Sequence, residues 1–122
     1  MYPCVCCGHL SVPEPPGSYY ICPICFWEDD DVQLRWPTMS GGANRVSLIE
    51  AQANFRAFGA KERRHIARVR PPTDGEGVEP GWRPVDEERD RFETWGVGPI
   101  VNWPGDKTVL YWWRPTYWRL AP

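Results

Sequence analysis

The sequence lacks long hydrophobic runs and contains only two histidines. No segment approaches the ~20 consecutive apolar residues that a membrane-spanning helix needs. The first cysteine is residue 4, which leaves no room ahead of it for the apolar part of a secretory signal. Neither histidine lies in a recognised motif with a serine or an acid, so no catalytic set emerges. These absences predict a cytoplasmic protein that is not an enzyme and does not enter a membrane.

The sequence also has little net charge, −2 with a pI of about 5.7, which argues against a bulk attraction to nucleic acid. The charges nevertheless lie in blocks along the chain. Residues 1–40 carry one base against five acids, and residues 41–70 carry seven bases against two acids. Residues 71–122 carry six bases against nine acids. Such blocks pair inside the fold or face a partner, and internal pairing is the commoner outcome.

What the sequence does have is cysteine, five in all, with four arranged as two Cys-x-x-Cys pairs. An odd count and paired spacing fit a disulfide framework poorly, whereas two such pairs let four thiolates surround one ion as a tetrahedron. Zinc is the expected ion because it closes structural sites with four protein ligands. Iron in a rubredoxin-like site is the rival. We predict one structural zinc, held by Cys4, Cys7, Cys22 and Cys25.

The fifth cysteine, Cys6, falls outside the pair spacing. A Cys-x-Cys bite fits one tetrahedral ion less well than Cys-x-x-Cys. Cys6 is therefore a small packed side chain or a reactive thiol beside the metal, and packing is the commoner role. His9 is expected at the surface or next to the site, because four sulfurs already complete the coordination.

Fourteen prolines and eleven glycines divide the chain into short elements. Residues 11–12 and 18–21 read as antiparallel strands around a Pro/Gly loop, which predicts an N-terminal zinc ribbon. Ser47 and Glu50 form a capping-box pattern and Gly59 is a stop signal, which predicts one amphipathic helix over about 47–58. A second short turn is expected over 61–69.

The C-terminal part is rich in tryptophan and predicts strands. Residues 100–102 and 108–112 flank a turn and read as a hairpin, with a third strand over 117–120. The predicted fold class is therefore α+β: a zinc ribbon, one helix and a C-terminal antiparallel Trp-rich hairpin or meander. We expect residues 1–72 to form the metal-binding domain, and residues 73–122 to pack on it as one compact unit.

Several segments resemble the cysteine-rich CPCC family. They are YPCVCCG at 2–8, PPGSY at 15–19, ICPICFWEDD at 21–30, GGANRVSL at 41–48, AQANFRAFGA at 51–60 and VRPP at 69–72. The resemblance covers about 70 of the 122 residues, and Val5 stands where the family has proline. It implies small, mostly bacterial proteins that bind zinc at rubredoxin-like knuckles. The family has no assigned reaction, so it offers no catalytic residues to carry over.

Two features could form a partner surface. The first is the run of acids directly after the second cysteine pair: Glu28, Asp29, Asp30 and Asp31. These acids either pair internally with Arg35, Arg45 and the basic residues of 56–70 or meet a basic partner. The second is the tryptophans, among which Trp113 and Trp118 lie beside arginines. Tryptophan and arginine dominate interface hot spots, although packing explains them equally well.

Three functional hypotheses follow. The first is a non-enzymatic, zinc-stabilised protein-binding module, in its most concrete form an immunity- or antitoxin-like protein that neutralises a basic toxin enzyme. The second is a nucleic-acid-binding zinc ribbon that acts through residues 61–70. The third is a rubredoxin-like redox protein, which would require iron in the cysteine site.

Overall fold

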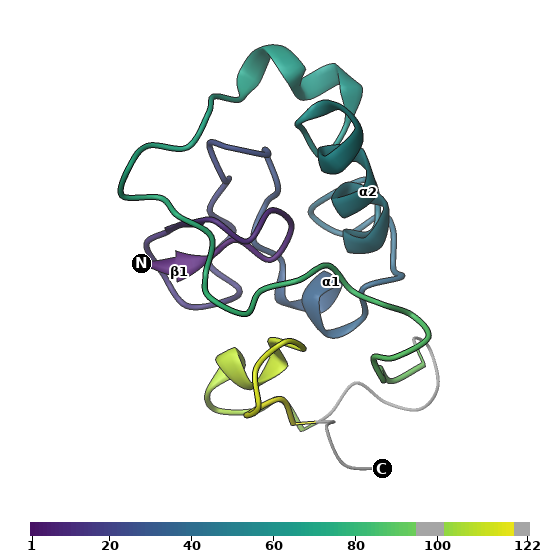
Figure 1. Cartoon of the computed structure of the whole chain (residues 1–122). Coiled ribbons are helices and arrows are strands. Elements are labelled where there is room, and N and C mark those ends of the chain that lie inside the picture. Colours follow the sequence, from purple (N-terminus) through teal and green to yellow (C-terminus); the bar gives the residue numbers. More distant parts are fainter. Residues whose placement is uncertain (95–101, 119–122) are drawn as a thin grey trace.

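The computed structural model describes residues 1–94 and 102–118, and shows a small α+β fold with few regular elements (Figure 1). The elements are β1 (Tyr2–Pro3), β2 (Leu10–Val12), α1 (Asp31–Arg35), α2 (Leu48–Phe58) and two 3₁₀ helices, η1 (Arg63–Arg68) and η2 (Lys107–Leu110). None of the helices in the described ranges is long and apolar enough to cross a membrane.

The sheet is small and its pairing differs from the predicted ribbon. β2 pairs antiparallel with β1, not with residues 18–21. The 18–21 segment is instead joined to the chain after the second cysteine pair by an isolated bridge between Ile21 and Glu28. On the other side of β2, Leu10 donates to the carbonyl of Gly77 at 2.9 Å, and His9 bridges to Val78. Residues 77 and 78, which follow the predicted domain boundary, thus contact the chain beside the two-stranded sheet.

Helix α2 confirms the predicted helix. The Ser47 side chain accepts from the Glu50 N–H, and the Glu50 side chain accepts in return from the Ser47 N–H. The helix ends at Gly59, whose φ of 87° lies in the left-handed region that glycine adopts readily. Leu48 and Ala51 are fully buried, so this face packs on the core. Helix η1 follows within the second turn expected over 61–69.

Helix α1 was not predicted. It has only five residues and lies inside the acidic run. The Asp30 side chain accepts from the N–H groups of Val32 and Gln33 and so caps its first turn. Within α1, Gln33 and Leu34 are buried.

The predicted C-terminal strand over 108–112 is wrong. Residues 107–110 form η2, where the Asp106 side chain accepts from the Thr108 N–H, and η2 packs against α1. Leu110, Tyr111 and Trp112 are buried in succession, whereas a strand would turn alternate side chains outward. Trp118 lies in a turn, and the predicted residues 100–101 and 119–120 fall outside the described ranges.

Candidate metal centre

The four paired cysteines come together in the protein interior. The Sγ atoms of Cys4, Cys7, Cys22 and Cys25 all lie within 4.8 Å of one another, and all four residues are buried. The Cys4 and Cys25 sulfurs are 3.5 Å apart, and those of Cys7 and Cys22 are 3.8 Å apart. Zinc–sulfur bonds of about 2.3 Å in a regular tetrahedron separate the sulfurs by about 3.8 Å. Disulfide sulfurs, by contrast, lie only about 2.05 Å apart. The donor set therefore fits one tetrahedral metal ion.

The first cysteine pair lies on a tight turn that two main-chain hydrogen bonds close. The Cys4 N–H donates to the His9 carbonyl at 2.8 Å, and the Gly8 N–H donates to the Cys4 carbonyl at 2.7 Å. Gly8 has a φ of +81°. A Cβ atom at Gly8 would also lie 2.5 Å from a ring carbon of Trp82. Glycine is required here both for the backbone conformation and for the close packing of the tryptophan.

The second pair repeats this pattern. The Cys22 N–H donates to the Trp27 carbonyl at 2.9 Å, and the Phe26 N–H donates to the Cys22 carbonyl at 2.8 Å. Phe26 occupies the position equivalent to Gly8 and has a φ of 73°, at a cost of roughly 1–2 kcal/mol for a residue with a side chain. Its ring packs against that of His65, tilted by 34°, with centroids 4.5 Å apart. This contact packs the turn of the second cysteine pair against η1.

Four thiolates this close need a cation. Burial raises the pKa of Cys4 and Cys25, and hydrogen bonding to Cys22 raises that of Cys7. Hydrogen bonds from the other cysteines lower the pKa of Cys22. The Ser11 hydroxyl lies 3.1 Å from the Cys22 sulfur. A divalent ion would let all four sulfurs ionise, because its charge offsets their mutual repulsion.

Cys6 and His9 take the positions expected for residues outside the coordination sphere. Cys6 is 1% exposed and belongs to the hydrophobic core, and its sulfur is not part of the four-sulfur cluster. The Nδ1 atom of His9 lies 2.7 Å from the carbonyl oxygen of Glu76. The packing alternative for Cys6 therefore agrees with its place in the structure.

The acidic run does not form the exposed strip that a partner surface would need. Asp29 is 8% exposed and accepts hydrogen bonds from the N–H and hydroxyl of Ser18. Asp30 is 4% exposed and caps α1. Asp31 pairs with Lys107. Glu28 is half-buried, and no hydrogen bond or ion pair of its carboxylate is found in the described ranges.

The bases that we expected to form ion pairs with these acids have other partners. Arg35 pairs with Glu93, at 2.6 Å. Arg45 and Arg64 both pair with the buried Glu62. Of the four acids, only Asp31 forms an ion pair in the described ranges, and its partner is Lys107 instead of one of the expected bases. The charges of Arg35, Arg45 and Arg64 are nevertheless offset inside the fold, by Glu93 and Glu62.

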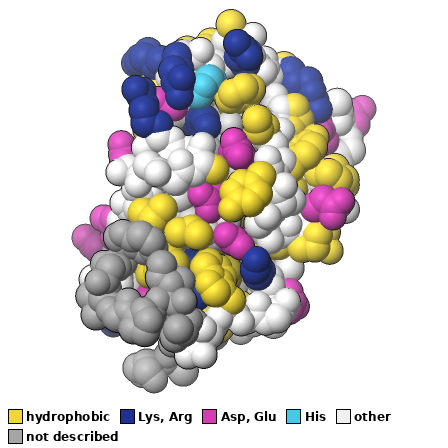
Figure 2. All heavy atoms as spheres, turned by 180° about the vertical axis from the view of Figure 1, so that it is seen from behind, with side chains coloured by type: hydrophobic (Ala, Val, Ile, Leu, Met, Phe, Trp, Pro, Cys, Tyr) yellow, Lys and Arg dark blue, Asp and Glu magenta, His cyan; other side chains and the backbone are white. Residues whose placement is uncertain are grey.

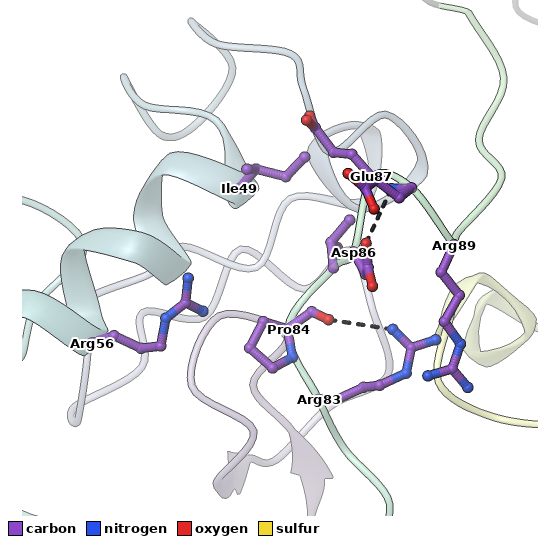
Figure 3. Close-up of a pocket in the computed structure, with 9 residues that line it drawn as sticks. Ile49, Arg56, Arg83, Pro84, Asp86, Glu87 and Arg89 are labelled. Carbon is purple, nitrogen blue, oxygen red and sulfur yellow. Dashed lines mark hydrogen bonds between the residues drawn. The ribbon is translucent and has the colours of Figure 1, made fainter.

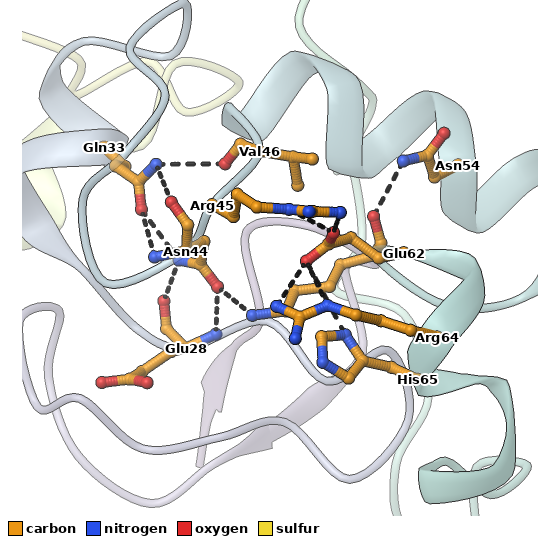
Figure 4. Close-up of polar contacts among 10 residues, drawn as sticks. Glu28, Gln33, Asn44, Arg45, Val46, Asn54, Glu62, Arg64 and His65 are labelled. Atoms are coloured by element: carbon orange, nitrogen blue, oxygen red, sulfur yellow. Dashed lines mark hydrogen bonds and ion pairs between the residues drawn. The ribbon is translucent and has the colours of Figure 1, made fainter.

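A buried polar network lies next to the second cysteine pair, and we did not predict it from the sequence (Figure 4). Gln33 and Asn44 are both 0% exposed. The Asn44 side chain accepts from the Glu28 N–H and the Lys61 ammonium, and donates to the Glu28 carbonyl and Gln33. The Lys61 N–H in turn donates to the Cys25 carbonyl at 2.8 Å. Burial lowers the pKa of Lys61, and the carboxylates of Glu62 and Glu28 oppose that shift.

Basic side chains collect at the end of the molecule where η1 lies (Figure 2). The side chains of Arg45 and Arg64 are 72% and 60% exposed, although both contact Glu62, whose side chain is 4% exposed. Arg63 and Arg68 are also exposed. One buried carboxylate therefore orients two guanidinium groups whose outer edges face solvent.

The two tryptophans predicted to face a partner are half-buried in aromatic clusters. The Trp113 ring stacks on Tyr111 with centroids 4.7 Å apart, and its indole N–H donates to Glu79. Trp118 lies under the guanidinium of Arg35, 4.7 Å from the ring centroid. Both rings thus contribute to internal packing.

Comparison with known proteins identifies one family. A family model described as Cysteine-rich CPCC matches residues 2–76, which includes all four clustered cysteines and both helices α1 and α2. The match confirms the resemblance seen in the sequence and extends it by a few residues. No curated protein matches the sequence.

Proposed function

We propose that this protein, which belongs to the cysteine-rich CPCC family, is a zinc-stabilised protein-binding module and not an enzyme. The observation that carries the proposal is the closed arrangement of four buried sulfurs. A zinc ion with four protein ligands keeps no open position for water or substrate, so it stabilises a fold and does not activate a reactant. The ion would hold together two loops that otherwise share little regular structure.

Metal analysis of three proteins tests this role: the natural chain, Cys7→Ser and Cys6→Ala. The natural chain and Cys6→Ala should each carry one zinc, because Cys6 lies outside the cluster. Cys7→Ser should bind zinc weakly and lose folded structure, since structural zinc supplies about 10–16 kcal/mol to such sites. Full zinc in Cys7→Ser, or loss of zinc in Cys6→Ala, would contradict the ligand assignment.

The same samples distinguish zinc from iron. A rubredoxin-like redox role requires iron, which gives a red protein with a visible absorption band. We expect a colourless, zinc-loaded protein even from cells grown with ample iron. Stoichiometric iron in freshly purified protein would favour the redox role instead.

The partner we propose is a protein, with a toxin enzyme neutralised in the manner of an immunity protein as the specific case. Small size, the four-sulfur site and the half-buried Glu28 carboxylate, for which the described ranges show no hydrogen bond or ion pair, support this idea. Co-expression with a basic enzyme encoded next to this protein should yield a complex. Glu28→Gln should weaken that complex, whereas Glu14→Gln, at an exposed acid, should not. Equal effects of the two substitutions would remove Glu28 from the interface.

Nucleic-acid binding is the second candidate, and the exposed arginines around η1 favour it. Binding of this kind should weaken steeply with salt, because each phosphate contact releases counterions. Arg64→Ala should reduce the affinity for RNA or DNA and lower the salt dependence. No shift of RNA or DNA at micromolar protein and low salt would exclude the candidate.

A further inference from the structure

We propose that a cavity between the 86–91 turn and residues 112–117 binds a small phosphorylated ligand with a flat ring, of the mononucleotide class. The cavity has a volume of about 300 Å³. Ligand-binding pockets usually range from about 300 to 1,000 Å³, so this one suits a compact ligand. It lies beyond residue 76, where the family match ends, and it is independent of the metal centre.

The walls of the cavity are fixed by hydrogen bonds. Arg83 pairs with Asp90 through two guanidinium nitrogens, at 2.6 and 2.8 Å. The Trp112 indole donates to the Arg83 carbonyl at 3.1 Å, and the Tyr117 hydroxyl donates to the Arg91 carbonyl at 2.8 Å. A pocket held in this way loses little conformational freedom when a ligand enters.

The opposite wall is held by one carboxylate that lies behind it. Glu79 accepts from the indole N–H of Trp113 and from the guanidinium of Arg114. Glu79 does not itself line the cavity. Its charge positions the aromatic ring and offsets that of Arg114.

The lining carries excess positive charge. Four arginines face the cavity against one carboxylate, Asp90. Arg83 and Arg114 already have acidic partners. For Arg89 and Arg91, the described ranges show no side-chain hydrogen bond or ion pair, and both residues are exposed. Two uncommitted guanidinium groups match a phosphate dianion, which arginine binds through paired N–H donors.

The aromatic side chains define the rest of the ligand. Trp112, Trp113 and Tyr117 line the same cavity as the arginines. Aromatic rings next to guanidinium groups favour a ligand that joins a flat ring to an anion. A nucleoside monophosphate has both parts in a size that the cavity accommodates.

A larger neighbouring groove of about 570 Å³ is a poorer anion site, although it shares Arg83 and Arg89 with the cavity (Figure 3). Its lining also includes three consecutive acids, at 86–88. These acids offset its arginines, and it has no aromatic side chain. We therefore place the anion in the smaller cavity.

Isothermal titration calorimetry with AMP, adenosine and inorganic phosphate tests the proposal, using the zinc-loaded full chain at low salt. AMP should bind more tightly than either fragment, because only AMP engages both the aromatic and the cationic walls. Arg89→Ala and Arg91→Ala should each weaken AMP binding ~10-fold, the usual effect of losing a hydrogen bond to a charged group. Arg68→Ala, at an exposed arginine of η1, is the matched control and should leave the affinity unchanged.

Circular dichroism and zinc content should be the same for all three variants, because the substituted side chains are exposed. Equal weakening by Arg68→Ala would mean a diffuse charge effect and would overturn the site. Equal affinity for adenosine and AMP would overturn the role of the arginines. A zinc-loaded protein that binds no AMP would refute this proposal alone and leave the zinc-stabilised module intact.

Discussion

Replacing Asn44 tests how much the buried polar network contributes to stability. Asn44→Leu keeps the approximate volume but removes all four side-chain hydrogen bonds. The side-chain oxygen of Gln33 still accepts a hydrogen bond from the main-chain N–H of residue 44, at 3.0 Å. The N–H and carbonyl of Glu28 and the Lys61 ammonium lose their Asn44 partner. An unsatisfied buried polar group costs about 1–3 kcal/mol, so for these three groups the low end of the range gives a loss of about 3 kcal/mol.

A loss of this size is a large part of the stability of a small domain, which is about 5–15 kcal/mol in total. Urea unfolding with zinc present measures it as a fall in the midpoint of about 2 M at an unchanged slope. Asn54→Leu is the matched control, because Asn54 makes a single hydrogen bond, to the Lys61 carbonyl, and is half-buried. It should cost about 1 kcal/mol. Equal losses in the two variants, or a loss under 1 kcal/mol for Asn44→Leu, would mean that the Asn44 side chain does not hold this network together.

Two further predictions concern Gly8 and Tyr111. Gly8→Ala should destabilise the fold by about 3 kcal/mol or more, because the new Cβ strains a left-handed residue and overlaps the ring of Trp82. Gly59→Ala, at a similar φ with open space around it, should cost only about 1 kcal/mol, and equal urea midpoints would contradict this difference. Burial raises the pKa of Tyr111, so its phenol should stay protonated at pH 11 while the unfolded chain ionises all five tyrosines. The unfolded state then releases more protons, so stability should fall as the pH rises above about 10, and ultraviolet difference spectra should show fewer ionised tyrosines in the native protein than in guanidinium. Identical spectra for the two states at pH 11 would contradict the burial of this phenol.

The sequence alone was sufficient where local chemistry decides the structure. Ligand spacing identifies Cys4, Cys7, Cys22 and Cys25 without reference to the rest of the chain, because the two turns depend on nearby residues. Helix α2 was predictable for the same reason, since Ser47 and Gly59 mark its ends directly. Each of these signals operates over a few residues.

The C-terminal part could not be predicted in this way. Thr108, Val109 and Leu110 have strand-like residue types, but the Asp106 cap and burial against α1 favour a 3₁₀ turn. Tertiary contacts commonly override β-propensity, which mostly reflects how a side chain fits its surroundings. The short helix α1 had a usable signal, the capping residue Asp30, which we considered only as one of a run of four acids.

Asp29 and Asp30, two of the four acids considered for a partner surface, are buried in the fold. Asp29 and Asp30 bind main-chain and side-chain donors of their own fold, so they are structural acids. A run of acids can satisfy the unpaired N–H groups of a loop or a helix start as readily as it can meet a protein. Only the three-dimensional arrangement distinguishes these uses.

The strand-like segment at 77–79 also bears on how the chain behaves when shortened. Ending the chain at residue 76, where the family match ends, would remove two main-chain hydrogen bonds. One runs from the Leu10 N–H to the Gly77 carbonyl, and the other from the Glu79 N–H to the Gly8 carbonyl. One flank of the sheet would then offer bare main-chain groups, which recruit a strand from another molecule. A truncated form should therefore self-associate even when loaded with zinc. Residues 77–122 would then protect the full-length chain from aggregation.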